Sequence, residues 1–294
     1  MRIVFVGCVQ FSKAVLEKLL ILEANIIGIV TKTESQVNSD FADISVLATN
    51  YDIPVRFVKD INHANNVKWI RNLSPDVIFC FGWSNLLKKD LLQSAPMGVV
   101  GYHPALLPAN KGRHPLIWAK VLGLPKTGST FFFMDEGADS GDILCQETFK
   151  IDFEDDAEML YKRMIQTALI QVEKFLPLLV NGNYERLPQS KGEGNTWRKR
   201  GRTDGLVDFR MSTKNLCNLI RALTRPYVGA HCWYIDREIK IWKAEPGKCV
   251  QHNIEPGKVL SVVDNIIELK TGDSSIFLTE HEFEILPQIN NYIN

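Results

Sequence analysis

The sequence predicts an α/β domain with a mostly parallel sheet, followed by a smaller β-rich domain. The first is predicted by a β-branched apolar run at residues 2–6, helical apolar spacing over 11–22 and a second apolar run at 26–30. A strand, a helix and a strand in this order form a right-handed crossover within a parallel sheet. After residue 229 the pattern changes to short alternating runs separated by turn residues, which is typical of a small open barrel or sandwich.

Apolar periodicity defines the remaining elements of the first domain in order. Gly7 closes the first strand, and Ser12 is placed to cap the helix that follows. The apolar runs predict further strands at residues 54–58, 76–81, 99–103 and 129–134. Helical spacing predicts helices at 44–50, 64–73, from near 86, from the corner at 112–115 through 122, and over 154–179.

A polar, glycine-rich stretch at residues 192–205 predicts a linker between the two domains. We therefore expect a first domain over 1–198 and a second over 199–294. The basic residues in and beside this stretch are more typical of a solvated connection than of a binding site; they are Lys191, Arg198, Lys199, Arg200 and Arg202. In the second domain we expect a helix over 208–224, then strands at HCWYI, REIKIW, GKVLSVV, NIIEL and SIFL.

Composition excludes some classes of function. The chain has 294 residues, with 34 Lys and Arg against 34 Asp and Glu, so no net charge attracts it to nucleic acid or to an anionic membrane. Its six cysteines show no CxxC or other metal spacing, which indicates free thiols in a reducing compartment. The N-terminus has no signal-peptide pattern, and no apolar run approaches the ~18 residues of a membrane span. We expect a cytoplasmic protein without a metal.

Candidate chemistry concentrates between Gly98 and Leu144. A buried strand ends there at His103, and an acidic, glycine-punctuated loop carrying Asp139 follows the next predicted strand. Loops at strand ends present the reacting groups of α/β proteins, so we expect these two side chains to meet in an active site. The earlier turn GCVQF is not GxGxxG, which argues against a dinucleotide site. Its Gln10 is a predicted substrate contact, with a structural turn residue as the equal alternative.

The strings HPALLPANKGRHPLIWA and TGSTFFFMDEGADSGDIL resemble the signature of folate-dependent formyltransferases. That family's pattern has Asn-x-His, Ser-Leu-Leu-Pro, an Arg-Gly-x-x-Pro corner and then Asp-x-Gly. MRIVFVG at the start, the strand end at Phe81 and Gly82, and the later IRALTRPYVGA also fit, so the resemblance covers nearly the whole chain. It implies a Rossmann-like first domain, an OB-like second domain, and formyl transfer from N10-formyltetrahydrofolate to a primary amine.

The resemblance also implies roles for particular residues. Formyl transfer needs a group that takes the proton of the amine and donors that stabilise the oxyanion. Histidine titrates near neutral pH, so His103 is expected to handle the proton, and Asp139 to orient the imidazole, stabilise its cation or relay the proton. The implied folate contacts are Phe81, Gly82, Trp83, Leu86, Leu87, Asp135 and Asp142. Core packing of Trp83 and solvated loop carboxylates at Asp135 and Asp142 stay open as alternatives.

One residue departs from the family pattern. Gly101 stands where the family has the asparagine that helps to hold the formyl oxygen. Asn110, His114 or a backbone N–H group can take over this role; we count Asn110 with the catalytic residues and His114 with the substrate contacts. We expect Gly101 at the edge of the cleft, where a change to asparagine is tolerated or mildly perturbing.

Basic residues beside the corner predict the substrate contacts. Lys111 and Arg113 flank Gly112, and two cations with backbone N–H groups suit a diphosphate. Surface solvation is the equal alternative for this pair. Arg221 and Tyr227 of the second domain are predicted to reach the same cleft.

Three acceptors of the formyl group are weighed within the family: methionyl-tRNA, a nucleotide-linked amino sugar and glycinamide ribonucleotide. A tRNA-binding surface needs clustered cations, yet residues 199–294 hold 13 Lys and Arg against 12 Asp and Glu. The loop TKTESQVNSDFAD is acidic where the tRNA enzymes carry a basic insertion. Both features argue against tRNA.

The corner GRHPLIWA resembles the bacterial nucleotide-sugar N-formyltransferases, and GYHP with KGRHPLIWAKVLGL resembles their pseudaminic-acid-pathway type. This resemblance implies a UDP- or dTDP-linked 4-amino-4,6-dideoxy sugar, formylated for a surface glycan. Methionyl-tRNA formyltransferase is the alternative enzyme, and a non-catalytic binding protein with the same fold is the alternative class. A homodimer through the second domain also stays open.

Overall fold

The computed structural model describes residues 1–34, 39–190 and 192–293. Part of the acidic loop TKTESQVNSDFAD, and Lys191 of the basic cluster, lie outside the described residues. The chain divides into two compact units: the first holds Met1–Pro115, Thr127–Phe149 and Lys162–Trp197, and the second holds Leu116–Lys126, Lys150–Tyr161 and Arg198–Asn294. The domain boundary between residues 198 and 199 stays a prediction.

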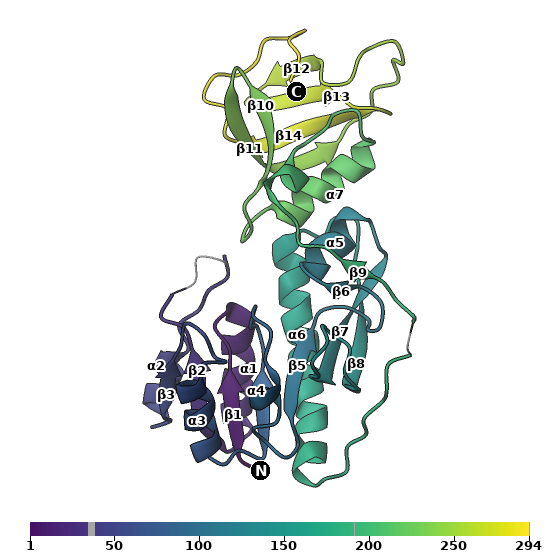
Figure 1. Ribbon diagram of the computed structural model, residues 1–294. Coiled ribbons are helices and arrows are strands. Elements are labelled where there is room, and N and C mark those ends of the chain that lie inside the picture. Colours follow the sequence, from purple (N-terminus) through teal and green to yellow (C-terminus); the bar gives the residue numbers. More distant parts are fainter. Residues whose placement is uncertain (35–38, 191, 294) are drawn as a thin grey trace. The chain divides into compact units, whose positions relative to one another are not determined.

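The first unit is built on a seven-stranded sheet in the order β3-β2-β1-β4-β5-β7-β8 (Figure 1). Its strands are β1 (Ile3–Val6), β2 (Ile26–Thr31), β3 (Val55–Phe57), β4 (Val77–Cys80), β5 (Val99–His103), β7 (Lys126–Phe133) and β8 (Ile143–Lys150). A separate pair joins β6 (Lys111–Gly112) and β9 (Thr196–Trp197). The helices along this part of the chain are α1 (Gln10–Ile21), α2 (Ser45–Asn50), α3 (Ala64–Asn72), α4 (Lys89–Leu92), α5 (Pro115–Val121) and α6 (Ala157–Val180).

Strand direction confirms the mostly parallel sheet. The pairings β2 with β3, β1 with β2, β1 with β4 and β4 with β5 are all parallel. Only then does the chain reverse, because β5 pairs with β7 in the antiparallel sense and His103 stands opposite Thr130. The carboxyl ends of β1, β4 and β5 therefore share one edge of the sheet, where the crevices of such sheets open.

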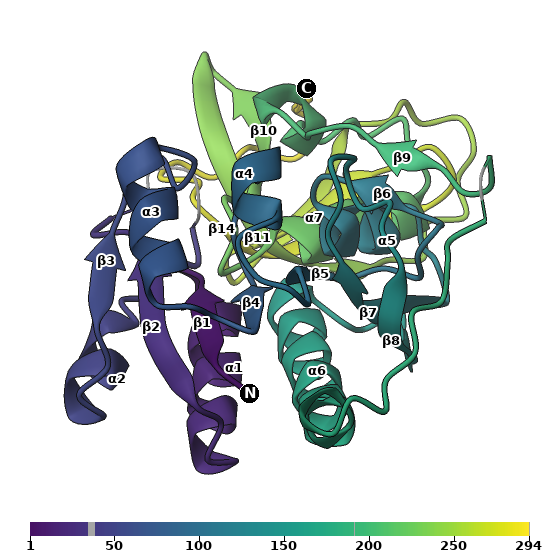
Figure 2. The same cartoon turned by 60° about the horizontal axis from the view of Figure 1, so that its bottom comes forward.

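Helices cover both faces of this sheet. α3 and α4 lie over one face and α1 and α6 over the other (Figure 2). The central strands are consequently buried on both sides, and neighbouring residues point to opposite helix layers. Ile78 packs with Ile70 of α3 and Leu91 of α4, whereas the next residue, Phe79, packs edge-on against Phe175 of α6 with ring centroids 6.2 Å apart.

Ser12 is not the cap of the first helix, as the sequence suggested, but its third residue. Its buried hydroxyl accepts hydrogen bonds from the N–H groups of Cys8 at 3.1 Å and Val9 at 3.2 Å. The same hydroxyl donates to the carbonyl of Phe81 at 2.6 Å. One short side chain thus joins the ends of β1 and β4.

The helix expected from near residue 86 begins three residues later, at Lys89. The side chain of Asn62 donates to the carbonyl of Leu86 at 3.0 Å and accepts from the N–H of Lys88 at 2.7 Å. A helix that began at Leu86 would bond the carbonyl of Leu86 to the N–H of Asp90; this carbonyl is bonded to Asn62 instead, which holds residues 86–88 in a loop. A sequence window around residue 86 does not contain Asn62.

The second unit has its own antiparallel sheet, in the order β10-β11-β14-β13-β12. Its strands are β10 (Ala230–Tyr234), β11 (Arg237–Pro246), β12 (Val259–Val263), β13 (Ile266–Lys270) and β14 (Ser275–His281), preceded by the 3-10 helix η1 (Arg202–Gly205) and by α7 (Thr213–Leu223). Ser212 caps α7, and Leu216 and Ile220 of this helix pack in one core with Ile241 and Leu278 of the sheet. The predicted fold class, α/β followed by a β-rich domain, is confirmed.

Candidate active site

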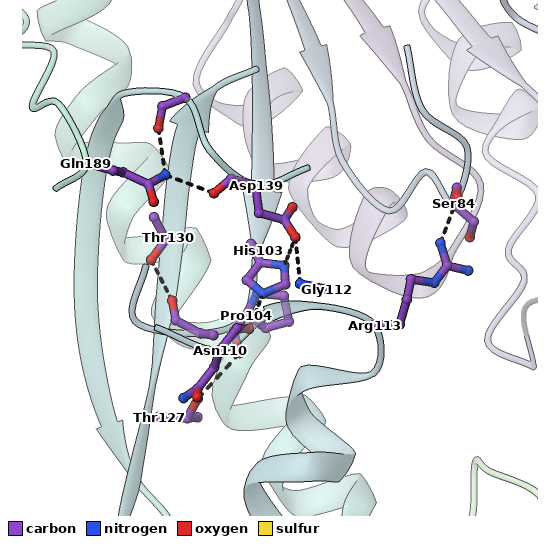
Figure 3. Close-up of polar contacts among 12 residues, drawn as sticks. Ser84, His103, Pro104, Asn110, Gly112, Arg113, Thr127, Thr130, Asp139 and Gln189 are labelled. Carbon is purple, nitrogen blue, oxygen red and sulfur yellow. Dashed lines mark hydrogen bonds and ion pairs between the residues drawn. The ribbon is translucent and has the colours of Figure 1, made fainter. Parts of the chain in front are cut away.

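His103 is the last residue of β5, and its ring lies between two oxygen atoms (Figure 3). Nε2 is 2.8 Å from the carbonyl oxygen of Asn110, and Nδ1 is 3.6 Å from Oδ2 of Asp139. A carbonyl only accepts hydrogen bonds, so Nε2 carries the hydrogen that it donates to Asn110. His103 is 4% exposed, and both polar atoms of its ring are therefore oriented by the protein.

Asp139 lies in the loop between β7 and β8, with its backbone in the left-handed region at φ 55°. Its Oδ2 faces His103 and also accepts from the N–H of Gly112 at 2.9 Å. The predicted meeting of a histidine and an aspartate from separate loops is thus present in the geometry. In the same loop Asp135 is exposed, and its Oδ1 accepts from the N–H of Gly137 and from the hydroxyl of Ser140. Asp135 therefore shapes its own turn.

The turn after His103 brings the predicted corner beside the imidazole. Thr130 donates to the carbonyl of Ala105 at 2.6 Å, and Gln146 donates to the carbonyl of Leu107 at 2.9 Å, so the sheet holds this turn. Asn110 then adopts a left-handed conformation, φ 64°, which presents its carbonyl to His103. Asparagine tolerates this conformation better than most residues.

The basic corner lies next to the same turn. Lys111 is part of β6, and Arg113 donates to the carbonyl of Ser84 at 2.9 Å (Figure 3). His114 is half-buried and left-handed, with φ 56°. Gln10 is the exposed first residue of α1, and its N–H bonds to the carbonyl of Asp40.

The predicted folate contacts differ in how they are placed at the end of β4. Phe81 is fully buried and stacks on Phe79 with centroids 5.3 Å apart, so its ring belongs to the core. Gly82 has φ 69°, and a Cβ there would lie 2.3 Å from Val9. Leu87 is buried, whereas Leu86 is 66% exposed and Asp142 is half-buried.

Trp83 is half-buried, and Lys32 lies over its ring at 4.7 Å from the centroid. Its indole Nε1 is buried and makes no hydrogen bond within the part of the chain that the structure describes. Buried donors are normally paired, so this N–H is available to an acceptor from a ligand.

Gly101 is a buried residue inside β5. A Cβ at this position would lie 2.8 Å from Cγ and 3.0 Å from Sδ of Met134, and 3.2 Å from the ring of Phe132. A side chain at Gly101 therefore requires the flexible side chain of Met134 to move, and the expectation that asparagine is tolerated or mildly perturbing there stays a prediction.

Arg221 and Tyr227 both belong to the second unit. Arg221 is 7% exposed, and it donates to the carbonyl of Phe153 at 2.9 Å and to Glu245 at 3.0 Å. These contacts are those of a structural arginine, so they do not support the predicted substrate role. Tyr227 is half-buried in the turn after α7, and its N–H bonds to the carbonyl of Thr224.

Two residues beside His103 were not predicted. Gln189 donates to the carbonyls of Asp139 and Gly141, and Asn195 accepts from the N–H of Asn110. Both follow α6, with Gln189 just before the predicted linker at residues 192–205 and Asn195 inside it. The only hint in the sequence is a pair of amide side chains among glycines and charges, which does not indicate what they contact.

Within the described residues, no three histidine, cysteine, aspartate or glutamate side chains are grouped so that they could hold a metal ion. Over the same residues, no helix combines the length and the apolar character that crossing a membrane requires.

Comparisons with known proteins show the family of the chain. The family model for formyl transferase matches residues 1–172, and the model for the formyl transferase C-terminal domain matches residues 200–289. The bifunctional polymyxin resistance protein ArnA of Wigglesworthia glossinidia brevipalpis is 30% identical over 275 residues, which cover 92% of this chain and 42% of ArnA. The chain thus spans less than half the length of this relative.

Solved structures share the fold. An N-formyltransferase from Helicobacter canadensis, in complex with folinic acid and dTDP-3-aminofucose, matches with a TM-score of 0.69 at 17% identity over 94% of this chain and 98% of that one. HypX from Aquifex aeolicus, in complex with tetrahydrofolic acid, matches with a TM-score of 0.66 at 20% identity over 96% of this chain and 44% of its own. With the family model matching more than half of its residues, the chain belongs to the formyl transferase family.

Proposed function

We propose that this protein transfers a formyl group from N10-formyltetrahydrofolate to the amino group of a nucleotide-linked amino sugar. The observation that carries the proposal is the position of His103, with Nδ1 3.6 Å from Asp139 and Nε2 bonded to Asn110 at a strand end. Membership of the formyl transferase family supports the reaction class. The complex of the Helicobacter canadensis enzyme with folinic acid and dTDP-3-aminofucose supports this pair of substrates.

In this proposal His103 accepts the proton that the amine loses, and Asp139 stabilises the cation that forms. The amine bonds to the formyl carbon, the bond from that carbon to N10 of the folate breaks, and the amine releases one proton. An imidazole can accept this proton near neutral pH and pass it to N10 of the departing tetrahydrofolate. Asp139 faces Nδ1, where a carboxylate stabilises the imidazolium. The N–H of Gly112 bonds to the same carboxylate oxygen and keeps it in place.

The folate would supply the formyl group, and the end of β4 is where we propose that it binds. Trp83 offers a buried N–H without a partner among the described residues, which fits an acceptor on a flat heterocycle. Leu87 is buried shortly after this strand end, and Asp142 is half-buried in the loop between β7 and β8. We assign Phe81, Gly82 and Asp135 to shaping this region, since Phe81 stacks on Phe79, Gly82 adjoins Val9 and Asp135 bonds within its own turn.

For the nucleotide we propose the corner that carries Lys111 and Arg113. Their cationic side chains and the neighbouring backbone N–H groups suit the diphosphate of a UDP- or dTDP-linked sugar. Gln10 and His114 are the further contacts that we propose. Arg221 is omitted, because its guanidinium is buried among partners of the second unit.

We propose Asn110 as the residue that replaces the family's asparagine. Its carbonyl already contacts His103, so its side chain starts within a few ångströms of the imidazole. Asn110→Gly keeps the left-handed backbone and removes the amide, whereas Asn110→Asp keeps the shape and removes the donor. We expect both changes to lower kcat by about 10²-fold, the effect of losing one oxyanion donor. Unchanged kcat in Asn110→Gly would assign the role to another group.

The direct test is a screen of nucleotide amino sugars with N10-formyltetrahydrofolate, followed by mass spectrometry. We expect the gain of one formyl group on a UDP- or dTDP-linked 4-amino-4,6-dideoxy sugar. Methionyl-tRNA is included as a competing acceptor. Formylation of the tRNA alone would overturn the proposed substrate, and no transfer to any amine would overturn the proposed activity.

A further inference from the structure

After α6 ends, the chain runs back along the candidate active site. We call residues 186–190 and 192–197 the return segment. Leu187 exchanges two hydrogen bonds with Ile143 of β8, at 2.8 and 2.9 Å, and β9 pairs with β6. The return segment therefore contacts both loops that flank His103, the one that carries Asp139 and the one that carries Asn110.

Gln189 holds the loop of Asp139. Its Nε2 donates to the carbonyl of Asp139 at 3.0 Å and to the carbonyl of Gly141 at 2.7 Å (Figure 3). Both acceptors are carbonyls, so only the NH2 end of the amide can face them. Its Oε1 is buried without a hydrogen bond among the described residues. An unsatisfied buried oxygen is unfavourable, so the contribution of this side chain lies in its two donated bonds.

Asn195 holds the other loop. Its Oδ1 accepts from the N–H of Asn110 at 2.8 Å, and its own carbonyl accepts from the N–H of Lys111 at 3.0 Å. Gly194 has φ 88°, and a Cβ there would lie 2.0 Å from the carbonyl oxygen of Pro108, so only glycine permits this approach. The N–H of Asn110 is thus bonded to Asn195, and the carbonyl of Asn110 is bonded to His103.

We propose that Gln189 and Asn195 are positioning residues, which set Asp139 and Asn110 at their places on either side of the His103 imidazole. Neither side chain bonds to the imidazole itself: Gln189 acts through the backbone of Asp139, and Asn195 acts through the backbone of Asn110. This inference rests on the proposed function and adds to it the part of the chain that fixes the geometry of proton transfer.

The two amides act in opposite hydrogen-bonding roles, and this difference makes the proposal testable. Gln189 is needed as a donor, which a carboxylate cannot replace. Asn195 is needed as an acceptor, which a carboxylate can replace. Replacement of each amide by the acid of the same shape should therefore impair one site and spare the other. A role in stability alone does not predict a selective loss of kcat.

The experiment compares steady-state kinetics of Gln189→Glu, Asn195→Asp and Asn195→Ala with the unchanged protein, using the amino sugar found in the screen. We expect Gln189→Glu and Asn195→Ala to lower kcat by about 10- to 100-fold with KM within about twofold, because small misplacements of catalytic groups cost this much. We expect Asn195→Asp to keep kcat within about threefold. Asn183→Asp, at an exposed position after α6, adds the same charge and should behave as the unchanged protein.

Two outcomes would overturn the inference: wild-type kcat in Gln189→Glu, or an equal loss in Asn195→Asp and Asn195→Ala. A second measurement does not need turnover. The 15N signals of the His103 ring, assigned with His103→Gln, report the hydrogen bonds of both ring nitrogens in the unliganded protein. We expect these signals to move in Gln189→Glu and Asn195→Ala and to stay in Asn183→Asp. If the unchanged protein transfers no formyl group, the proposed function fails, and the positioning role is decided by these signals alone.

Discussion

At the level of single residues, the side chain of His103 is held in one orientation by contacts to both of its ring nitrogens. Its Nε2 is bonded to a carbonyl, and its Nδ1 faces a carboxylate that a backbone N–H also holds. The ring can therefore neither turn nor exchange its nitrogens without breaking a contact. An imidazole fixed in this way is prepared to receive a proton in one place.

The first prediction concerns this imidazole. We expect His103→Ala to lower kcat by about 10²–10⁴-fold, the range for loss of a general acid or base. The measurement is the rate of formyl transfer at saturating substrates, with circular dichroism as the control for folding. Turnover at the wild-type rate in a folded variant would remove His103 from the mechanism and leave Asp139 without the role proposed here.

The second prediction concerns Gly101 and Met134. A side chain at Gly101 must displace Met134, whose Cγ would be 2.8 Å from the new Cβ. We expect Gly101→Asn to lower the free energy of unfolding by about 1–3 kcal/mol, as overpacking does. Met134→Ala removes the obstacle, so in the double variant the loss should be smaller than the sum of the single losses. Strictly additive values from urea unfolding would show that Met134 does not occupy this space.

At the level of elements, most strands and helices follow from local patterns. The run IVFV and the helical spacing after it specify β1 and α1 because both faces of a central strand, but only one stripe of a helix, are buried. The strands of the second unit follow in the same way from alternation and turn residues. The meeting of His103 and Asp139 was predictable because a strand end and a glycine-punctuated loop are recognisable without partners, whereas the roles assigned to them come from the family resemblance.

Elements that depend on distant partners were not predictable. β6 and β9 have two residues each and exist only because residues 111–112 meet residues 196–197. The start of α4 depends on Asn62, 24 positions before Leu86. Gln189 and Asn195 act through contacts 50 and 85 positions away. No periodicity within a window of the sequence carries such information.

The third prediction concerns the junction of β1, α1 and β4. Ser12→Ala leaves the N–H groups of Cys8 and Val9 and the carbonyl of Phe81 without the hydroxyl that satisfies them. Buried groups left without partners cost about 1–3 kcal/mol each, so we expect a loss of unfolding free energy of at least about 2 kcal/mol. Urea unfolding measures it, and Ser39→Ala at an exposed position is the control. A loss no larger than in this control would show that other groups satisfy the junction.

At the level of the whole molecule, the chain builds two cores from interleaved segments. Residues 116–126 and 150–161 leave the first unit and join the second. Lys120, which is 1% exposed, ties these segments together: its Nζ donates to the carbonyls of Asp152 at 3.0 Å and Phe153 at 2.7 Å. Arg221 of α7 donates to the same carbonyl of Phe153. A buried lysine thus joins residues 116–126 to residues 150–161.

This burial predicts how stability depends on pH. Burial, and secondarily the charge of Arg221, lowers the pKa of Lys120 to about 8, against 10.5 for an ordinary lysine. The folded protein therefore releases this proton at a lower pH than the unfolded chain, which binds more protons between pH 8 and 10.5. Stability rises with pH wherever the unfolded chain binds more protons. The contribution of Lys120 to stability is lowest below pH 8 and increases through this window.

The fourth prediction isolates this contribution with Lys120→Met, which cannot titrate. Loss of the two hydrogen bonds lowers the stability of the variant by an amount that does not depend on pH, so the test is the slope. Between pH 7.5 and 9.5 we expect the unfolding free energy of the unchanged protein to rise by about 2 kcal/mol relative to that of the variant. The comparison cancels the buried thiol of Cys232, whose raised pKa acts in the opposite direction above pH 9 in both proteins. Lys126→Met, at an exposed lysine of the same unit, should follow the unchanged protein. Parallel profiles for Lys120→Met and the unchanged protein would mean that the ammonium group is solvated, and that the two segments are joined without a buried charge.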